Sequence, residues 1–403
     1  MKHKKLDLVI LAGGRGTRIN NITKKIPKPM IKFGGIPFLK YLINYYSRYN
    51  FENIYILSGY KHKFICNYFK KIKRVNSINI EVIVEKKPMG TGGALFNLKK
   101  KNINDFFLIN GDSYYELEQA EFDRMYLTKK NCSMFLIKNI NYLSNKTLSN
   151  FKLTNGQINK NKGNLMNSGI YFFKKKILDN ISEKKISLEN DIVKKYIAEG
   201  KIDLFKINKN KFFIDIGTYK NFKLSQQILR KKLSFASIFL DRDGVINKLM
   251  PYISDLKKFK LRKNVLKTFK YLNKNKINIF IITNQAGIAK GYFTEKKYLF
   301  FEKKIKNFFY SKGVYINDVK YCPFHPKGKI KKYTKISKYR KPGNFMIRDI
   351  LNEWPIDLKK SVMIGDQKSD LSAAKSINLK FQYVEDDILK QIKKNKFYIK
   401  KKN

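Results

Sequence analysis

Leu8-Val-Ile-Leu-Ala-Gly-Gly-Arg-Gly-Thr-Arg18, close to the start of the chain, joins an apolar run to a glycine-rich loop. The apolar run predicts a buried first strand. Gly13, Gly14 and Gly16 would let backbone N–H groups of the loop approach phosphate oxygens without obstruction by side chains. The loop matches neither the dinucleotide pattern G-x-G-x-x-G nor the P-loop pattern G-x-x-x-x-G-K. Taken alone, it is compatible with a phosphate site or with a tight structural turn.

Beyond this loop, short β-rich runs alternate with helical stretches through the 403 residues. The alternation is typical of an α/β fold, in which helices cover a parallel sheet. A chain of this length exceeds one typical core, and we expect two domains, residues 1–232 and 233–403. Strands are expected at 8–11, 53–58, 80–84, 106–109, 133–137, 169–173, 237–240, 277–283 and 361–364, and helices at 38–49, 219–233, 265–273 and 298–311.

Two aspartates of the first half follow predicted strands. Asp112 comes after the strand at 106–109, and Asp215 has a similar context much later. In α/β sheets, ligands bind at the carboxyl ends of the strands. Because Mg²⁺ in phosphate sites prefers few carboxylates together with substrate oxygens, the pair predicts a magnesium site. Arg18 and Lys28 would add positive charge where a triphosphate reacts.

The second half carries another acidic pair, in Phe239-Leu-Asp-Arg-Asp-Gly-Val245. Asp241 follows a buried-type strand and could attack phosphorus to form an aspartyl phosphate. Asp243 could protonate the leaving oxygen and then activate water. Asp241, Asp243 and Asp366 are the expected Mg²⁺ ligands, with Asp370 behind them to orient a bound water. Phosphate contacts are expected from Thr283, Asn284, Gln285 and Lys341.

Residues 1 to about 230 resemble the sugar-phosphate nucleotidyltransferase family. The resemblance rests on Leu11–Arg18, Pro27-Lys-Pro29, the loop Glu85–Gly93, Asn110-Gly-Asp112, Asn167-Ser-Gly-Ile-Tyr171, Ser187-Leu-Glu-Asn-Asp191 and Asp215-Ile-Gly-Thr218. It implies a Rossmann-like domain of GT-A type, in which a sugar 1-phosphate oxygen attacks the α-phosphorus of a nucleoside triphosphate. Asp112 and Asp215 would hold Mg²⁺, and Arg18 and Lys28 would stabilise the transferring group. Substrate contacts are implied for Gly13, Gly14, Gly16, Thr17, Gly90, Thr91, Gly92, Asn167 and Glu189, with Lys162 as the best match to a family Glu-Lys pair.

Residues from about 235 to 385 resemble the haloacid-dehalogenase-like phosphatases, which have a Rossmannoid domain. Within them they are similar to the D-glycero-D-manno-heptose 1,7-bisphosphate 7-phosphatases, through Asp241–Asn247 and Thr283–Phe293. The resemblance implies substrate contacts for Lys290 and Arg340. Lys290 stands where the family normally has Arg, so it keeps the charge but not the planar fork.

Many members of this phosphatase family also hold a structural zinc ion, and here the sequence departs from them. Cys322 and His325 remain, but the later cysteine pair aligns with Ser337 and Tyr339. Two ligands cannot close a tetrahedral zinc site, so we predict no structural zinc.

The formal net charge of +55 invites a nucleic-acid hypothesis. The excess is nearly all Lys, spread along the chain, and Arg is scarce. We therefore expect anionic small substrates and not nucleic acid as partners. Three widely spaced cysteines indicate a reducing compartment, and no apolar run approaches the ~20 residues of a spanning helix. We expect a cytoplasmic protein without a membrane partner, and no pattern predicts its oligomeric state.

Together the two resemblances imply a bifunctional enzyme of nucleotide-activated heptose biosynthesis. It would remove the 7-phosphate of a heptose 1,7-bisphosphate and then join a nucleotide, with GTP the favoured donor, to the heptose 1-phosphate. Both steps would use Mg²⁺. Two alternatives stay open: the same chemistries on another sugar phosphate with a different triphosphate, or one domain that is inactive and regulatory.

Overall fold

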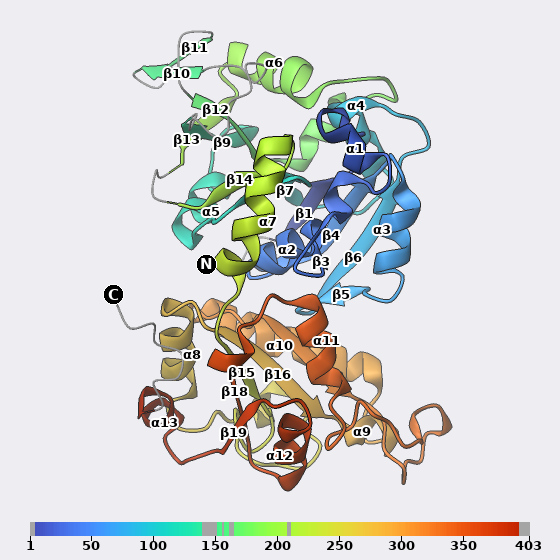
Figure 1. Cartoon of the computed structure of the whole chain (residues 1–403), viewed down its shortest axis with the longest axis vertical. Coiled ribbons are helices and arrows are strands. Elements are labelled where there is room, and N and C mark those ends of the chain that lie inside the picture. Colours follow the sequence, from blue (N-terminus) through green and yellow to red (C-terminus); the bar gives the residue numbers. More distant parts are fainter. Residues whose placement is uncertain (1–4, 139–150, 155–156, 161–164, 208–210, 395–403) are drawn as a thin grey trace. The chain divides into compact units, whose positions relative to one another are not determined.

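The computed structural model describes residues 5–138, 151–154, 157–160, 165–207 and 211–394, with helices and sheets alternating along the chain (Figure 1). The chain divides into two compact units. The first contains Met1–Ile43, Tyr49–Arg74 and Ile78–Leu229, and the second contains Asn44–Arg48, Val75–Ser77 and Arg230–Asn403. Each unit is built on a sheet of its own.

The first unit has a mixed sheet that counts ten strands over the described residues. Its centre is parallel and runs in the order β6 (Ile78–Val84), β4 (Phe51–Ser58), β1 (Leu6–Leu11) and β7 (Asp105–Asn110). β12 (Leu165–Phe173) pairs antiparallel with β7. Beyond it the sheet continues through β9 (Cys132–Lys138), β13 (Ile202–Lys206), β10 (Phe151–Thr154) and β11 (Gln157–Lys160), and β5 (Arg74–Val75) forms the other edge.

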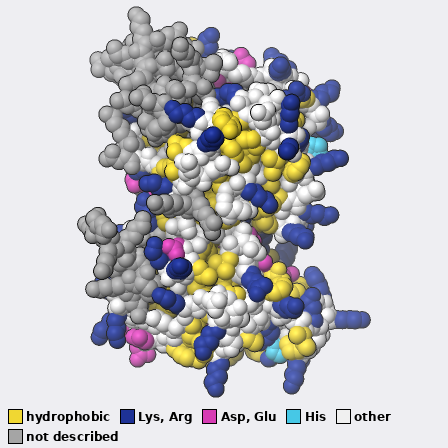
Figure 2. All heavy atoms as spheres, in the orientation of Figure 1, with side chains coloured by type: hydrophobic (Ala, Val, Ile, Leu, Met, Phe, Trp, Pro, Cys, Tyr) yellow, Lys and Arg dark blue, Asp and Glu magenta, His cyan; other side chains and the backbone are white. Residues whose placement is uncertain are grey.

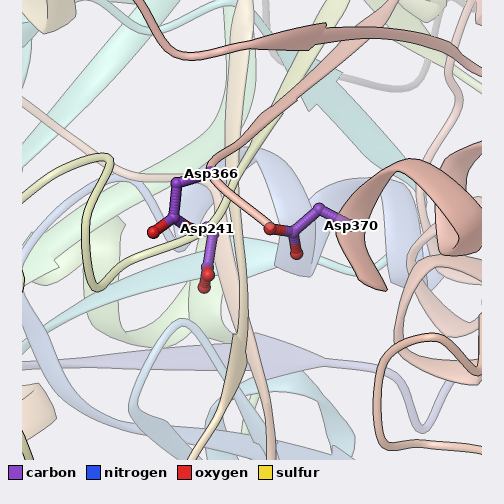
Figure 3. A group of neighbouring side chains, drawn as sticks. All are labelled: Asp241, Asp366 and Asp370. Carbon is purple, nitrogen blue, oxygen red and sulfur yellow. The ribbon is translucent and has the colours of Figure 1, made fainter. Parts of the chain in front are cut away.

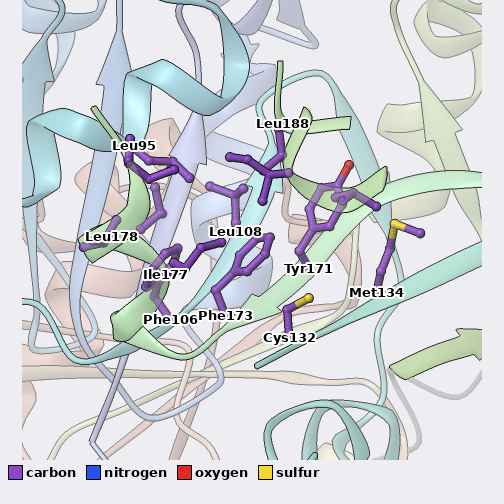
Figure 4. Packing of buried hydrophobic residues seen from close by; sticks show 14 of the residues in the cluster. Leu95, Phe106, Leu108, Cys132, Met134, Tyr171, Phe173, Ile177, Leu178 and Leu188 are labelled. Atoms are coloured by element: carbon purple, nitrogen blue, oxygen red, sulfur yellow. The ribbon is translucent and has the colours of Figure 1, made fainter. Parts of the chain in front are cut away.

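β1 forms because its run of apolar residues is buried on both faces, as is usual for a parallel strand. Leu8, Val9 and Ile10 have no exposed surface. One face of the sheet packs into a core in which Phe106 and Leu108 of β7 meet Tyr171 and Phe173 of β12 (Figure 4). This packing fixes the strands whose ends carry the first site.

Helices and short strands connect this sheet. The helices are α1 (Asn20–Thr23), α2 (Phe38–Tyr46), α3 (His62–Phe69), α4 (Gly90–Gly93), α5 (Gln119–Tyr126), α6 (Lys194–Ala198) and α7 (Tyr219–Leu233). Shorter turns are η1 (Thr17–Ile19), η2 (Lys28–Met30), η3 (Ala94–Leu98), η5 (Lys175–Asn180) and η6 (Leu188–Val193), and the small sheets contain β2 (Lys32–Phe33) with β3 (Ile36–Pro37) and β8 (Ser113–Tyr115) with β14 (Phe213–Asp215).

The second unit has a five-stranded sheet with all its neighbouring strands parallel. Its order is β17 (Asp318–Cys322), β16 (Asn278–Asn284), β15 (Ser237–Leu240), β18 (Val362–Gly365) and β19 (Lys380–Tyr383). The connecting helices are α8 (Val265–Lys274), α9 (Ala286–Ala289), α10 (Glu295–Ser311), α11 (Phe345–Glu353), α12 (Lys368–Lys375) and α13 (Ile388–Lys394), with turns η7 (Leu256–Lys258), η8 (Lys331–Tyr333) and η9 (Leu358–Lys360).

The helices of the second unit follow the apolar spacing of their sequences. α8 buries Val265, Thr268, Phe269 and Leu272, one face at helical spacing. The Oγ1 of Thr294 caps α10 by accepting from Lys297 N. The α/β class and all the predicted strands and helices are confirmed, but the helix predicted at 38–49 ends at Tyr46 and the one predicted at 298–311 begins at Glu295.

In the parallel part of each sheet, the order of the strands reverses direction at one position. In the first unit β1 lies between β4, which follows it, and β7; in the second, β15 lies between β16 and β18. Loops that leave such a pair of strands run in opposite directions, so a crevice opens at their carboxyl ends, where α/β proteins bind ligands. The glycine-rich loop and Asp112 follow β1 and β7, and Asp241 and Asp366 follow β15 and β18.

The positive charge is distributed over the surface. In Figure 2, Lys and Arg side chains are scattered across the visible face, with few acidic groups and patches of apolar surface between them. The described residues contain no helix that combines the length and apolar character required to cross a bilayer.

Candidate active sites

The first site lies around a cavity of about 140 Å³ at the end of β1 and β7. Gly14 of the glycine-rich loop, Lys28 of η2, Thr91 of α4 and Asp112 all line it. The backbone N–H of Gly111 donates to Leu11 O at 2.8 Å, which joins the two loops. Gly13, Gly16 and Thr17 belong to the same loop, and Gly16 has a φ of 66°, a conformation that favours glycine.

An ion pair stands at the wall of this cavity. Lys28 Nζ lies 2.8 Å from Asp112 Oδ2, and the Lys28 side chain is only 9% exposed. Burial alone would raise the pKa of Asp112, but Lys28 and then Arg18 lower it below its ordinary value. The two cations therefore favour the ionised form of Asp112.

Asp215 lies next to Asp112, because β14 pairs antiparallel with β8 and Ile216 N donates to Asp112 O at 2.9 Å. Burial, followed by the charge of Asp112, raises the pKa of Asp215 to about 7. A methyl group at Gly217 would lie 2.6 Å from Asp215 Oδ1 and 3.5 Å from Arg18 Nη2, so the guanidinium is close to this carboxylate. Two adjacent, repelling carboxylates suit a divalent metal ion.

Of the two predicted sugar contacts, Glu189 is joined by a hydrogen bond to Thr91, which lines the same cavity. Thr91 Oγ1 donates to Glu189 Oε2 at 2.9 Å and accepts from Leu188 N at 2.9 Å. Asn167 donates its side-chain amide to Tyr171 OH, and Gly169 N donates to Asn167 Oδ1 at 2.8 Å. Gly90 and Gly92 lie in α4 with Thr91. Lys162 is outside the described residues.

The second site is a group of carboxylates at the end of β15 and β18. Asp241, Asp366 and Asp370 each offer an oxygen within 4.8 Å of the others, and Figure 3 shows Asp370 extending from α12 toward the other two. Asp366 Oδ1 is buried and has no hydrogen-bond partner among the described residues. Gly244, with a φ of 87°, packs directly against Asp366, where a methyl group would collide with its carboxylate. The donor set and the open oxygen both fit a divalent cation.

Lys341 neutralises part of this acidic group. Its Nζ lies 2.9 Å from Asp241 Oδ1 and 2.6 Å from Asp370 Oδ1, and also donates to Ile282 O at 2.9 Å. Burial lowers the pKa of Lys341, but Asp241 and Asp370 outweigh it and raise that pKa above its ordinary value. Burial raises the pKa of Asp241 to about 6, although Lys341 opposes the increase.

Asp243 lies beside this group but is not among the three clustered carboxylates. Gln285 Nε2 donates to Asp243 Oδ2 at 3.1 Å and to Thr283 Oγ1 at 2.9 Å. Asn284 and Lys341 are joined by two hydrogen bonds, one to the Lys341 carbonyl at 3.2 Å and one from its N–H at 3.0 Å. These contacts bring the end of β16 and the loop that contains Lys341 close to Asp241.

Lys290 and Arg340 gather somewhat apart from the carboxylates. Lys290 Nζ donates to Tyr252 OH at 2.8 Å. Burial, then Arg340, then Lys290 lower the pKa of His325, so both cations are close to that imidazole. The structure therefore places the two predicted substrate contacts Lys290 and Arg340 near one another, beside His325.

The region that would hold zinc does not fit the metal. Cys322 Sγ lies 3.9 Å from Phe324 O, and His325 Nδ1 accepts from Lys327 N at 3.0 Å. Ser337 and Tyr339 replace the other two ligands of the family. The aspartate group is the only set of three or more clustered acidic, His or Cys ligands found among the residues that the structure describes.

Sequence reasoning missed the residues that hold these groups in place. Arg242 and Asn247 both donate to Asp243, and Gln367 Nε2 donates to Asp366 Oδ2 at 3.1 Å. All three lie within or next to the motifs that contain the predicted acids, so their closeness in sequence to Asp241, Asp243 or Asp366 could have identified them.

Comparisons with known proteins find relatives for both chemistries. A family model described as nucleotidyl transferase matches residues 8–139, and one described as HAD-hydrolase-like matches residues 338–397. The chain is 36% identical over 151 residues to the D-glycero-beta-D-manno-heptose-1,7-bisphosphate 7-phosphatase of Rhodopseudomonas palustris, covering 37% of this chain and 84% of the relative. It is 28% identical over 223 residues to the D-glycero-alpha-D-manno-heptose 1-phosphate guanylyltransferase of Campylobacter jejuni, covering 54% of this chain and 97% of the relative.

Among solved structures, HddC from Yersinia pseudotuberculosis complexed with GMP-PN is similar, with 29% identity and a TM-score of 0.47, over 55% of this chain and 99% of that one. The resemblances drawn from the sequence are confirmed: the chain is an enzyme that combines a nucleotidyltransferase with a HAD-like phosphatase. Both families use a divalent metal ion.

Proposed function

Since the chain belongs to the family of the D-glycero-D-manno-heptose 1,7-bisphosphate 7-phosphatases and also carries a nucleotidyl transferase domain, we propose that it makes a nucleotide-activated heptose in two steps. It removes the 7-phosphate of a heptose 1,7-bisphosphate and then transfers GMP from GTP to the heptose 1-phosphate, releasing pyrophosphate. The observation that carries the proposal is the pair of acidic sites, one at the reversal point of each parallel sheet.

The phosphatase step begins at Asp241. Its carboxylate oxygen forms a bond to phosphorus while the bond from phosphorus to the sugar O7 breaks, and O7 takes a proton from Asp243. Water then attacks the aspartyl phosphate, gives a proton to Asp243 and releases phosphate. Lys341 and Thr283 stabilise the phosphoryl oxygens. When bound, Mg²⁺ held by Asp241 and Asp366 neutralises charge on the phosphoryl group.

The transfer step needs no covalent enzyme intermediate. A phosphate oxygen of the sugar 1-phosphate bonds to the α-phosphorus of the triphosphate, and the bond to pyrophosphate breaks. Lys28 and Arg18 stabilise the charge on the transferring group, and backbone N–H groups of the glycine-rich loop hold the triphosphate. Asp112 and Asp215 would hold Mg²⁺, which binds triphosphate oxygens.

We assign the sugar contacts of the transfer site to Asn167 and Glu189, and the contact with the remaining 1-phosphate in the phosphatase site to Lys290 and Arg340. Two cations that lie near one another, beside His325, support this assignment, because a substrate with a phosphate at each end needs positive charge for the phosphate that is not cleaved. We further propose that the enzyme acts in the cytoplasm, since Cys66, Cys132 and Cys322 are all free thiols.

The anomer follows from the order of the steps. The product of the phosphatase must be the substrate of the transferase, and the relative that transfers GMP is named for the α anomer. We therefore propose the α-bisphosphate as the first substrate.

Product analysis tests the whole sequence. Purified protein receives Mg²⁺, one anomer of the bisphosphate and one nucleoside triphosphate, which carries guanine, adenine, uracil or thymine. The products are then separated by mass. We expect phosphate, pyrophosphate and GDP-heptose from the α anomer with GTP. Turnover with only deoxythymidine triphosphate would refute the choice of guanosine, and release of phosphate only from another sugar bisphosphate would refute the choice of heptose.

A further inference from the structure

Arg242 stands between the two aspartates of the phosphatase motif and is buried, with only 3% of its surface exposed. Its guanidinium is directed at a single carboxylate. Nη2 donates to Asp243 Oδ2 at 2.8 Å and to Oδ1 at 3.1 Å, and Nε donates to Oδ1 at 3.2 Å. This is a bidentate fork, which fixes the plane of a carboxylate as well as its position.

The surroundings of Arg242 hold the fork in that direction. The guanidinium carbon lies 5.8 Å from the ring centre of Tyr298 and 5.6 Å from that of Phe301. Nη1 is buried and has no hydrogen-bond partner among the described residues. Arg242 therefore keeps the hydrogen bonds of the fork although its Nη1 has no partner in the described part of the chain. Because buried polar groups are usually all hydrogen-bonded, this indicates that the contact with Asp243 decides the orientation of the guanidinium.

The main chain of Arg242 belongs to the same arrangement. Its carbonyl accepts from Ile246 N at 2.9 Å and from Asn247 N at 3.1 Å, which closes the loop. The side chain of Asn247 then donates to Asp243 Oδ1 at 3.0 Å, and Gln285 donates to Oδ2 at 3.1 Å. Asp243 is thus held from three sides, and among the residues that the structure describes only Arg242 contacts both of its oxygens.

We propose that Arg242 is a positioning residue that fixes the carboxyl group of Asp243 for proton transfer to the leaving oxygen. The inference rests on the proposed phosphatase function. As the bond from phosphorus to the sugar oxygen breaks and the bond from phosphorus to Asp241 forms, the proton of the Asp243 carboxyl group moves to the leaving oxygen. Without the fork, Asp243 would be held only by the neutral amide groups of Asn247 and Gln285, which come from two separate side chains, so its carboxyl plane would be fixed less firmly than by one rigid, charged guanidinium.

Two substrates with different leaving groups test this role. The leaving group of a sugar phosphate is an alkoxide of the sugar, which needs the proton. The leaving group of p-nitrophenyl phosphate is a stable phenolate, which does not. Arg242→Lys keeps the charge but loses the fork. Because general acid catalysis contributes roughly 10²–10⁴-fold, we expect this variant to lose about 10- to 100-fold in kcat/KM on the heptose bisphosphate and less than about threefold in kcat/KM on the aryl phosphate. The comparison uses kcat/KM because this constant reports the step that expels the leaving group and not the later attack of water, in which Asp243 serves both substrates. Both substrates are measured on one preparation, so the folded fraction cancels.

Arg262→Lys is the matched control. Arg262 Nη1 donates to Gly244 O at 2.6 Å, so this arginine supports the same loop without touching Asp243. We expect its substitution to change the two activities by the same factor. In a background that carries Asp243→Asn, Arg242→Lys should no longer alter the ratio of the activities, because it acts through Asp243.

Equal losses on the two substrates, or a changed ratio in the Asp243→Asn background, would overturn the role of Arg242 while leaving the phosphatase function intact. If the unmodified enzyme hydrolysed neither substrate, the proposed function would itself be refuted and this inference with it.

Discussion

Asp7 is a buried carboxylate of β1. It does not line the first site, but its removal should destabilise the strands that carry this site. Its Oδ1 accepts from the backbone N–H of Asn53 at 2.9 Å and from the side-chain amide of Asn53 at 3.0 Å. Its Oδ2 accepts from Asn104 in the same two ways, at 2.7 and 3.0 Å. The residue has no exposed surface. It therefore connects β1 to the chain segments at the starts of β4 and β7.

The magnitude follows from the groups that Asp7→Ala would leave without partners. Two half-buried backbone N–H groups, those of Asn53 and Asn104, would lose their acceptor, at about 1–3 kcal/mol each, and the amide side chains can turn toward other partners. We expect the first unit to lose about 4 kcal/mol of unfolding free energy. For a domain of this size each kcal/mol lowers Tm by about 2–4 °C, so its Tm should fall by roughly 8–16 °C.

Calorimetry of the full chain, combined with loss of nucleotidyl transfer after heating, measures this effect for the unit that carries the transferase site. Asp123→Ala is the control, since among the described residues the Asp123 side chain accepts a single, exposed hydrogen bond, from Gln119 Nε2 at 2.8 Å, and its removal should change stability by less than about 0.5 kcal/mol. A decrease in Tm no larger than that of the control would refute the reasoning, because it would mean that the four bonds of Asp7 contribute nothing net.

Three further outcomes are expected. Asp241→Asn should lower phosphate release by roughly 10⁴-fold or more and leave nucleotidyl transfer unchanged; loss of both activities in a folded variant would contradict two independent sites. Gly13→Ala should raise the KM for GTP by more than about tenfold, roughly 1.4 kcal/mol, because the added methyl group collides with Glu85 Oε1 and lies 3.1 Å from Gly59 N; unchanged KM would exclude this loop from triphosphate binding. Metal analysis should find no tightly bound zinc, and one zinc per chain would show that Cys322 and His325 recruit other ligands.

Much of the fold could be predicted because its central strands are buried on both faces. β1, β7, β15 and β18 each contain a run of three or four consecutive apolar residues, a pattern that is usual for a parallel strand buried on both faces. β19 (Lys380–Tyr383) escaped prediction because it is short and half-exposed. Such a strand forms only because a neighbouring strand supplies its hydrogen bonds, which is information that lies elsewhere in the chain.

The acidic residues of both sites could be predicted for a related reason. Asp112, Asp241 and Asp366 each follow a recognisable strand, so their place at a sheet edge follows from the strand. The partners of these acids could not be predicted in the same way. Lys28 meets Asp112 across 84 residues of sequence, and a pairing of that span depends on the tertiary fold. Arg242 gave no signal of burial, since a charged residue beside a strand end is usually solvated.

Both sites place a buried lysine against an acid that is expected to bind metal: Lys28 on Asp112 at 2.8 Å and Lys341 on Asp241 at 2.9 Å. A buried ammonium group without a partner would cost several kcal/mol, and so would an unpaired carboxylate. Before substrate binds, each charge satisfies the other. In the proposed reactions, a metal ion and a phosphate group that entered together would give the acid a cation and the lysine an anion, so neither charge would be left unpaired. The same exchange of partners would then serve both proposed phosphoryl reactions.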